Sequence, residues 1–249
     1  MTTLFQLKTR VNVSKAEEFF FEHPPIIWFA DGASLKGNRL TVLKGKFDPY
    51  PKEKIQTWEW KRVNIRKESQ GITKQTDSIQ FRVIEKLKKR NYQIIFDDDD
   101  SGEAADVVTV NVEEKSNKEK HICVEFYHCK FSLGDTPGGR IKDLYELCGQ
   151  AQKSIHWMED PYKLFAHLLR REPRKEKGQE MSRFERGDAD DLFEVMEMSR
   201  VYAVELKIFI VQPGLSKLKA TIGQLELLSV TENHLMGTYQ IPFTVIASP

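Results

Sequence analysis

The chain has 249 residues, 40% of them apolar and 10% aromatic, which is enough for one large domain with a hydrophobic core. Its 38 Lys and Arg residues nearly balance its 37 Asp and Glu residues, which argues against a protein that binds nucleic acid over its whole surface, so any phosphate-binding surface must be local. No run approaches the ~20 apolar residues of a membrane span, and no apolar leader stretch is present, so we expect no membrane anchor. The three cysteines form no CxxC pair, so we expect neither a disulfide framework nor a zinc site, which suits a cytoplasmic protein.

Residues 1–67 are predicted to form a β-rich N-terminal region. Residues 24–32 and 38–45 are short apolar runs separated by a turn that contains glycine, which is typical of a hairpin or meander. Residues 46–54 carry two prolines and are predicted to be a loop. Residues 57–67 then alternate large apolar side chains with polar or basic ones, as a half-buried strand does.

A helix and three strands are predicted next. Residues 76–91 repeat apolar side chains at helical spacing from Ile79 to Leu87, and Thr76 or Asp77 can cap the start of this helix. The strands are expected at residues 92–96, 104–112 and 121–132, with an acidic turn at residues 97–100.

The second half of the chain continues the alternation of helices and strands. We expect helices at residues 140–157, 161–172, 188–199 and, after a Pro-Gly turn, 213–237, and strands at residues 201–212 and 241–248. The highly charged residues 171–188 show no period and are predicted to be a mobile loop. This order predicts an α/β fold with a mixed central sheet flanked by helices, an αβββαβ core over residues 68–249 with a helical insertion at about 158–200.

Asp106 and Lys130 are the first candidates for catalysis. Asp106 opens the second of the three strands and Lys130 ends the third, so a hairpin in register brings the two together. Because alternate residues of a strand share a face, His128 is expected on the same side as Lys130. Hydrolysis of a phosphodiester needs carboxylates that hold a hard divalent cation, and it benefits from a lysine near the attacking water.

The segments GEAADVV and VEFYHCK, with the order of elements over roughly residues 76–157, resemble the PD-(D/E)XK nuclease superfamily. In that family one strand supplies an Asp and the next strand a (D/E)-x-K tripeptide. The resemblance implies that Asp106 holds the metal and that Lys130 positions water or stabilises the transition state. The tripeptide here reads His-Cys-Lys, so His128 stands where an acid is usual and is expected to orient a ligand or water.

The resemblance also implies the other parts of the site. The family carries an acid on the first helix, where Asp77 lies, and a Gln or basic residue on the second helix, where Gln152 and Lys153 lie. The implied cofactor is Mg²⁺ or Mn²⁺, held by Asp106 together with Glu103 or Asp77. Imidazole in place of an acid suits Mn²⁺ better than Mg²⁺.

Plainer roles stay open for several of these residues. His128 can be a hydrogen-bonded structural histidine, Asp77 a helix cap and Gln152 a core glutamine. Lys130 taken alone is typical of an exposed strand end. The acidic turn at residues 97–100 is either a solvated turn or a neighbour of the metal.

Basic residues near aromatic ones are the candidate nucleic-acid contacts, because they combine phosphate binding with base stacking. They are Arg62, Arg66 and Lys67 after Trp58 and Trp60, Lys153 on the second helix, and Arg170 and Arg171 at the end of the helix predicted at residues 161–172. The alternative is that each run is a solvated surface.

The sequence therefore predicts a metal-dependent nuclease that cleaves DNA, with RNA as the alternative substrate. The resemblance implies a place in a restriction or anti-phage system and a helicase or ATPase as a partner or as part of a longer parent chain. The main alternative is a catalytically inactive nuclease-like module that binds nucleic acid or supports assembly, and a structural subunit without nucleic-acid contact is the third. The Pro-Gly turn at residues 213–216 offers a weaker candidate anion site, at the start of the last helix.

Overall fold

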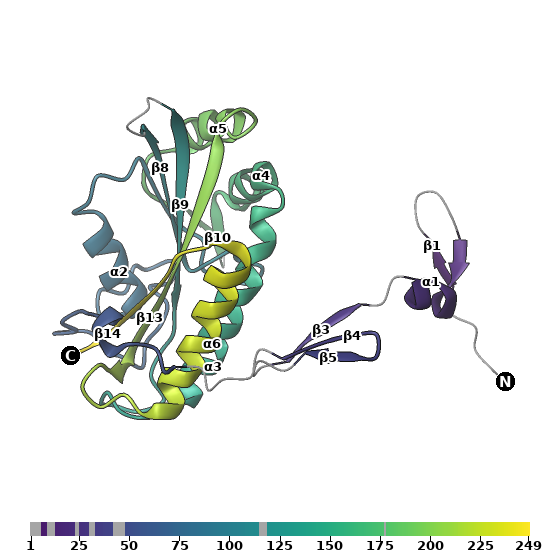
Figure 1. The fold of residues 1–249 in the computed structure, drawn as a ribbon. Helices are drawn as coiled ribbons and strands as arrows, with labels where there is room; N and C mark the ends of the chain where they lie inside the picture. The colour runs from purple at the N-terminus through teal and green to yellow at the C-terminus, as the bar shows by residue number, and fades with distance from the viewer. Residues whose placement is uncertain are drawn as a thin grey trace. The chain divides into compact units, whose positions relative to one another are not determined.

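The computed structural model describes residues 6–8, 13–22, 25–29, 33–41, 48–114, 119–176 and 178–249 (Figure 1). The chain divides into two compact units, Met1–Phe47 and Asp48–Pro249. The boundary predicted after residue 67 lies too late, since residues 48–67 belong to the larger unit, where strand β6 (Gln56–Thr57) pairs within the sheet.

The smaller unit contains short elements. Strands β1 (Gln6–Lys8) and β2 (Val13–Lys15) pair antiparallel and precede helix α1 (Ala16–Glu22). Strands β3 (Ile26–Trp28), β4 (Ser34–Lys36) and β5 (Arg39–Thr41) form a three-stranded antiparallel sheet. The predicted hairpin or meander is confirmed as a meander, although β4 lies where the turn between the two apolar runs was predicted.

The larger unit is built on a seven-stranded mixed sheet, in the order β12-β7-β8-β9-β13-β14-β6. Strands β12 to β9 run antiparallel to their neighbours, while β9, β13, β14 and β6 are parallel. The bounds are β7 (Ile94–Asp97), β8 (Val107–Glu114), β9 (Lys120–Cys129), β12 (Phe184–Arg186), β13 (Ala203–Ser216) and β14 (Phe243–Ser248). The predicted mixed α/β fold is confirmed.

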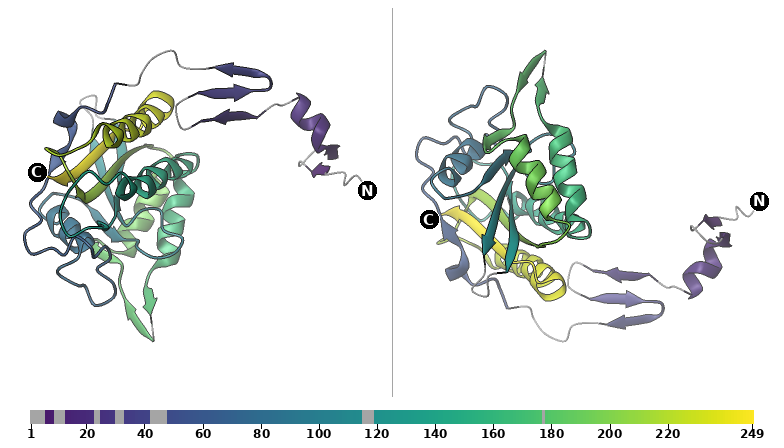
Figure 2. Two further views of the ribbon diagram at one scale, coloured as in Figure 1. Left: turned by 90° about the horizontal axis from the view of Figure 1, so that it is seen from below. Right: turned by 90° about the horizontal axis from the view of Figure 1, so that it is seen from above.

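Helices cover both faces of this sheet (Figures 1 and 2). Helix α2 (Ile79–Leu87) lies on one face, and α3 (Lys142–Lys153), α4 (Pro161–Arg171), α5 (Ala189–Met198) and α6 (Ile222–Tyr239) lie on the other. Strand alternation divides the core: Tyr127 and Cys129 pack with α2, whereas Phe126 packs with the other four helices. None of the described helices is both long enough and apolar enough to span a bilayer.

Two predicted segments differ from the structure. Residues 57–67 do not continue as a strand after Thr57, since the chain turns and the Asn64 N–H donates to the Asp77 carbonyl. The charged segment 171–188 is not a loop but contains the hairpin of β10 (Arg174–Glu176) and β11 (Gln179–Met181), which projects from the unit (Figure 2), and the edge strand β12. Charged side chains of this segment pair with residues far away in the sequence, and such pairs leave no periodic pattern from which they could be predicted.

The last helix begins later than predicted. Strand β13 continues through Pro213 to Ser216, and α6 starts only at Ile222, where Thr221 and Gln224 form a capping box. The Pro-Gly segment is therefore part of a strand, and the anion site predicted at a helix start there is wrong.

Candidate metal centre

The β8–β9 hairpin brings Asp106 to the end of β9, as predicted. Val107 pairs with Tyr127 in the antiparallel register, so the two chain ends beyond this pair meet. The side chain of Asp106 is buried, and its Oδ2 accepts a hydrogen bond of 2.8 Å from the Cys129 N–H. The hairpin fixes the position of Asp106, because the amide that binds its carboxylate belongs to Cys129 at the end of β9. Lys130 follows directly after Cys129.

Three carboxylates gather at this point. One oxygen each of Asp99, Glu103 and Asp106 lies within 4.8 Å of the others. Glu103 and Asp106 were predicted ligands, and Asp99 comes from the acidic turn that precedes them. Carboxylate oxygens at this spacing are the donor set that Mg²⁺ and Mn²⁺ prefer.

Each of these carboxylates has one oxygen held by the protein. Asp106 accepts from the Cys129 N–H, Glu103 accepts from the Asp100 N–H at 3.1 Å, and Asp99 accepts from the Ser69 hydroxyl. Within the described part of the chain, no hydrogen bond reaches the second oxygen of any of the three. Each residue thus keeps one carboxylate oxygen without a hydrogen bond, and the donor set fits a hard divalent metal.

The electrostatics of the cluster also favour a cation. Burial, and then repulsion from Glu103, raises the pKa of Asp106 well above its usual value. Burial raises the pKa of Glu103 to about 7, with added repulsion from Asp99 and other acids. A divalent cation would offset both the desolvation of these groups and their mutual repulsion.

Glu68 is a fourth acid at the centre, and it was not among the residues predicted from the sequence. Its Oε2 accepts a 2.9 Å hydrogen bond from the Phe131 N–H and lies 3.4 Å from the Lys130 Nζ. The negative charge of Glu68 contributes to the raised pKa of both Asp106 and Glu103. Glu68 lies in an irregular segment ahead of α2, where no helical or strand periodicity distinguishes it. The one sequence feature that could have indicated Glu68 is its place as an acid shortly before the first helix.

Lys130 lies between two carboxylates. Its Nζ is 2.7 Å from Glu146 on α3 and 3.4 Å from Glu68. Burial lowers the pKa of Lys130, but the contacts with Glu146 and Glu68 outweigh burial and the net direction is upward. The lysine is therefore charged at neutral pH, and Glu68 links it to the carboxylate cluster.

Arginines hold the acidic turn that carries Asp99. Arg171 pairs with the buried Asp98 and donates to its carbonyl at 2.7 Å, and Arg183 donates to the carbonyls of Asp97 and Asp99 at 3.0 and 2.9 Å. Burial raises the pKa of Asp98 to about 6 although Arg171 opposes the shift. The turn is thus anchored, and of the two predicted alternatives the structure places it beside the carboxylate cluster.

His128 does not join the carboxylates. Its buried Nε2 lies 2.8 Å from the Ser154 Oγ, which itself donates to the Gln150 carbonyl at 2.9 Å. The hydroxyl has a single hydrogen, so when it is donated to Gln150 the Nε2 of His128 carries the ring proton and Nδ1 is an acceptor. Burial lowers the pKa of His128 to about 3, which keeps the ring neutral.

Two further predicted site residues lie elsewhere. Asp77 accepts from Lys67 at 2.7 Å and is outside the three-acid cluster, while Ser78 caps α2. Gln152 points toward α6, where its Nε2 is 3.4 Å from the Thr231 hydroxyl.

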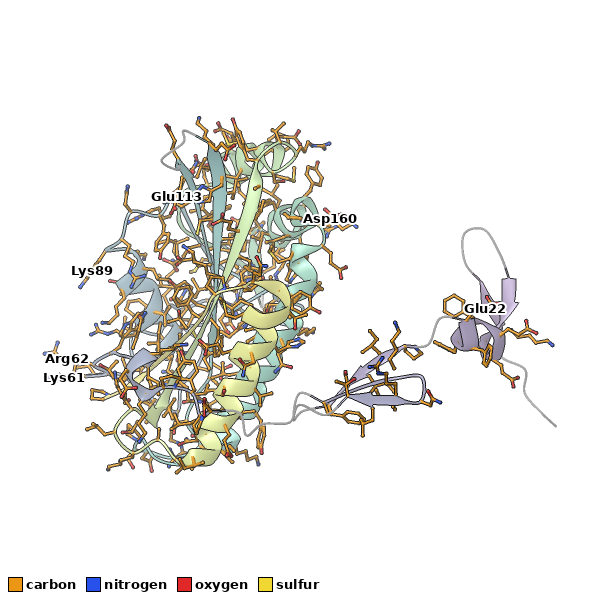
Figure 3. The ribbon with its side chains drawn as sticks, in the orientation of Figure 1. Glu22, Lys61, Arg62, Lys89, Glu113 and Asp160 are labelled. Atoms are coloured by element: carbon orange, nitrogen blue, oxygen red, sulfur yellow. The ribbon has the colours of Figure 1, made fainter. Side chains whose placement is uncertain are left out.

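The predicted nucleic-acid contacts are scattered. Arg66 pairs with Asp135 at 3.2 Å, and Arg62 extends outward from the surface (Figure 3). Arg170 is exposed at the end of α4, whereas Arg171 is engaged with the acidic turn. Of the basic candidates, Lys153 is the one that lines a pocket beside the carboxylates.

That pocket has a volume of about 370 Å³. It lies between the acidic turn and the end of α3, which the 3₁₀ helix η2 (Ser154–Met158) continues. Asp99 and Glu103 of the cluster form part of its wall. A ligand in the pocket would therefore reach the metal ligands.

Comparison with protein-family models, with curated proteins and with solved structures gives no significant match to this chain. The inference of function therefore depends on the geometry and chemistry of the residues described above.

Proposed function

We propose that the larger unit is a divalent-metal-dependent nuclease. The observation that carries this proposal is the set of three carboxylates in and after the acidic turn that precedes β8, each with one oxygen fixed by a hydrogen bond and one without a hydrogen bond. Buried acids that repel one another are costly, and such clusters are typical of sites that bind metal or perform acid–base chemistry.

The residues divide the work as follows. Asp99, Glu103 and Asp106 would hold Mg²⁺ or Mn²⁺, which polarises a phosphate and activates water. Lys130 supplies a positive charge for the pentacoordinate phosphate or the attacking water. Glu68 positions Lys130 through its ion pair and through the Phe131 N–H.

The proposed substrate is DNA, with RNA as the alternative, and the resemblance stated above adds a helicase or ATPase partner in a restriction or anti-phage system. A second candidate function is a nuclease-like module that binds nucleic acid without cleaving it. The observation that favours it is His128, which occupies the position of an acid, is neutral and binds Ser154 instead of the cluster.

Cleavage of supercoiled plasmid and of single-stranded oligonucleotides with Mg²⁺ or Mn²⁺ tests the proposal. Asp106→Asn and Lys130→Met are each expected to lower the rate by about 100-fold or more. The exposed residues Glu226 and Lys89 supply matched controls, since Glu226→Gln and Lys89→Met remove the same charges elsewhere.

Cleavage by the wild type and both controls, lost in the two site variants, supports the enzyme. DNA binding without cleavage under either metal, with a proposed motor partner also present, would instead favour the inactive module.

A further inference from the structure

The pocket beside the carboxylates has a second wall that the metal does not use. This wall consists of the last turn of α3 and η2, with Gln150, Lys153, Ser154, His156 and Trp157, and His128 of β9 also lines the pocket. At about 370 Å³ the volume is near the lower end of ligand pockets, which span ~300–1,000 Å³. It suits a single nucleoside unit.

Two buried acceptors of this wall have no hydrogen-bond donor in the described part of the protein. They are the Nδ1 of His128, a side chain that is 2% exposed, and the Oε1 of Gln150. With the Ser154 hydroxyl donating to Gln150, His128 donates its Nε2 proton to Ser154 and its Nδ1 is the acceptor. Unpaired buried polar atoms are costly, and a small shift of the two side chains toward the pocket would let an N–H group of an occupant reach them.

The rim of the pocket is aromatic and basic. The rings of His156 and Trp157 lie with centroids 4.5 Å apart, and His156 is exposed. Lys153 is an exposed cation on the same wall. Flat aromatic surfaces and a lysine are the groups that bind the base and the phosphate of a single strand.

We propose that this pocket holds one unpaired nucleobase of a DNA strand, next to the phosphate bound at the carboxylate cluster. The inference rests on the proposed nuclease function and specifies its substrate as single-stranded or locally unpaired DNA. Asp99 and Glu103 belong both to the cluster and to the pocket wall, so the base and the phosphate are parts of one nucleotide.

The hydrogen-bonding requirement explains why the base must be unpaired. Every nucleobase carries an N–H donor on its Watson–Crick edge, and pairing uses that donor. Enzymes that act on extruded bases read this edge with side-chain hydrogen bonds and enclose the base with aromatic or apolar groups. His128 and Gln150 provide acceptors for such an edge. In a base pair the partner base covers this edge, and only a groove-facing amino hydrogen of A, C or G stays free.

Equilibrium binding by fluorescence anisotropy tests this inference with the full chain. The probe is a short fluorescein-labelled single strand in Ca²⁺, which takes carboxylate oxygens, and gel electrophoresis verifies that the probe stays intact. The competitors are the same sequence as a blunt duplex and an abasic strand with the same number of phosphates. We expect both competitors to bind roughly tenfold more weakly than the single strand.

Gln150→Leu removes the polar group at nearly constant size and is expected to weaken single-strand binding roughly tenfold with little change for the abasic strand. Gln152→Leu is the matched control on the same helix, since Gln152 points to Thr231 and is expected to leave binding unchanged. His156→Ala, at an exposed position, gives a second pocket variant that does not disturb the core.

Equal affinity for single strand, duplex and abasic strand, with Gln150→Leu and His156→Ala both binding like the wild type, would overturn the base pocket even if Mn²⁺-dependent cleavage is observed. Base-dependent binding without cleavage under any metal would leave the pocket standing and would contradict the proposed nuclease. The two failures are therefore distinguishable.

Discussion

Asp106 is an acid at a position where burying a carboxylate costs free energy. Its carboxylate is buried at a strand start, where an apolar residue would pack without desolvation cost, and its neighbours Glu103 and Asp99 are acids as well. The pKa of Asp106 is raised by burial first and by Glu103 second. A cation bound between these side chains would offset both effects, so the free energy of unfolding should depend on metal and pH together.

Thermal unfolding with and without Mn²⁺ measures this dependence. The pKa of Glu103 is raised to about 7, so the metal-free protein gains stability from this group at low pH and loses it as the pH rises through about 7. Metal binds the ionised carboxylates and must displace their protons, so the Mn²⁺-induced rise in melting temperature should be larger at about pH 8 than at about pH 5.5. A rise that is equal or larger at the acidic pH would contradict the assignment.

Glu68 tests positioning at the same scale. Glu68→Gln keeps an oxygen for the Phe131 N–H but removes the charge opposite Lys130, and we expect the cleavage rate to fall about 10- to 100-fold. Glu146→Gln is the comparison, because Glu146 is the other and nearer partner of Lys130. Its side chain is 58% exposed and is no part of the carboxylate cluster, so we expect a smaller loss. Equal losses in both variants would remove the special role of Glu68.

At this scale the sequence predicted part of the centre. Asp106 and Glu103 follow from a hairpin with an acidic entry, and the structure places both in the cluster. Gln152 was predicted as a site residue or a core glutamine of the second helix, but the buried face of α3 carries Leu147 and Ala151, about one residue away. A helical stripe drawn from sequence tolerates that error, whereas the direction of a single side chain does not.

The elements that carry the site depend on charges from distant parts of the chain. The acidic turn between β7 and β8 is held by Arg171 at the end of α4 and by Arg183 just ahead of β12. The segment that contains Arg183 looked like a mobile loop because its charges have no helical or strand period. Its order comes from pairing with β7 and from these arginines, and both are long-range interactions.

Arg171→Met is expected to lower the free energy of unfolding by about 3 kcal/mol, because Asp98 is left buried without its partner. Arg170→Met is the matched control, since Arg170 is the exposed neighbour on the same helix, and it should change stability by less than about 0.5 kcal/mol. Urea denaturation measures both. The double variant with Asp98→Asn should recover part of the loss, and a loss that is unchanged in the double variant would show that the pair is not its cause.

Long periodic elements were predictable at this scale and irregular ones were not. The amphipathic helix α2 and the alternating strands β8 and β9 appear where their patterns place them. The residues after Thr57 alternate like a strand, yet they turn because Trp58 and Trp60 pack as a pair against the α2 side of the sheet. An alternation of apolar and polar residues indicates that one side of a segment is buried, and one side of a packed loop is buried as well.

At the scale of the whole molecule, all described residues of the site belong to one of the two units. The carboxylates, Glu68, Lys130 and the pocket all lie in the unit Asp48–Pro249. We therefore expect residues 48–249 alone to fold, with a melting temperature within about 4 °C of the full chain, and to keep Mn²⁺ binding. Calorimetric and thermal measurements on the two lengths decide this, and loss of metal binding in the shorter chain would mean that the N-terminal unit contributes to the site.

The central claim is that Asp99, Glu103 and Asp106 together bind a divalent cation. Isothermal titration of the full chain with Mn²⁺ at about pH 7.5 tests it most directly. The account predicts saturable binding by the wild type and by Glu226→Gln, and an affinity at least roughly tenfold weaker for Asp106→Asn, which keeps the hydrogen bond from Cys129 and so stays folded. Binding of equal affinity in Asp106→Asn, or no Mn²⁺ binding by the wild type, would contradict it.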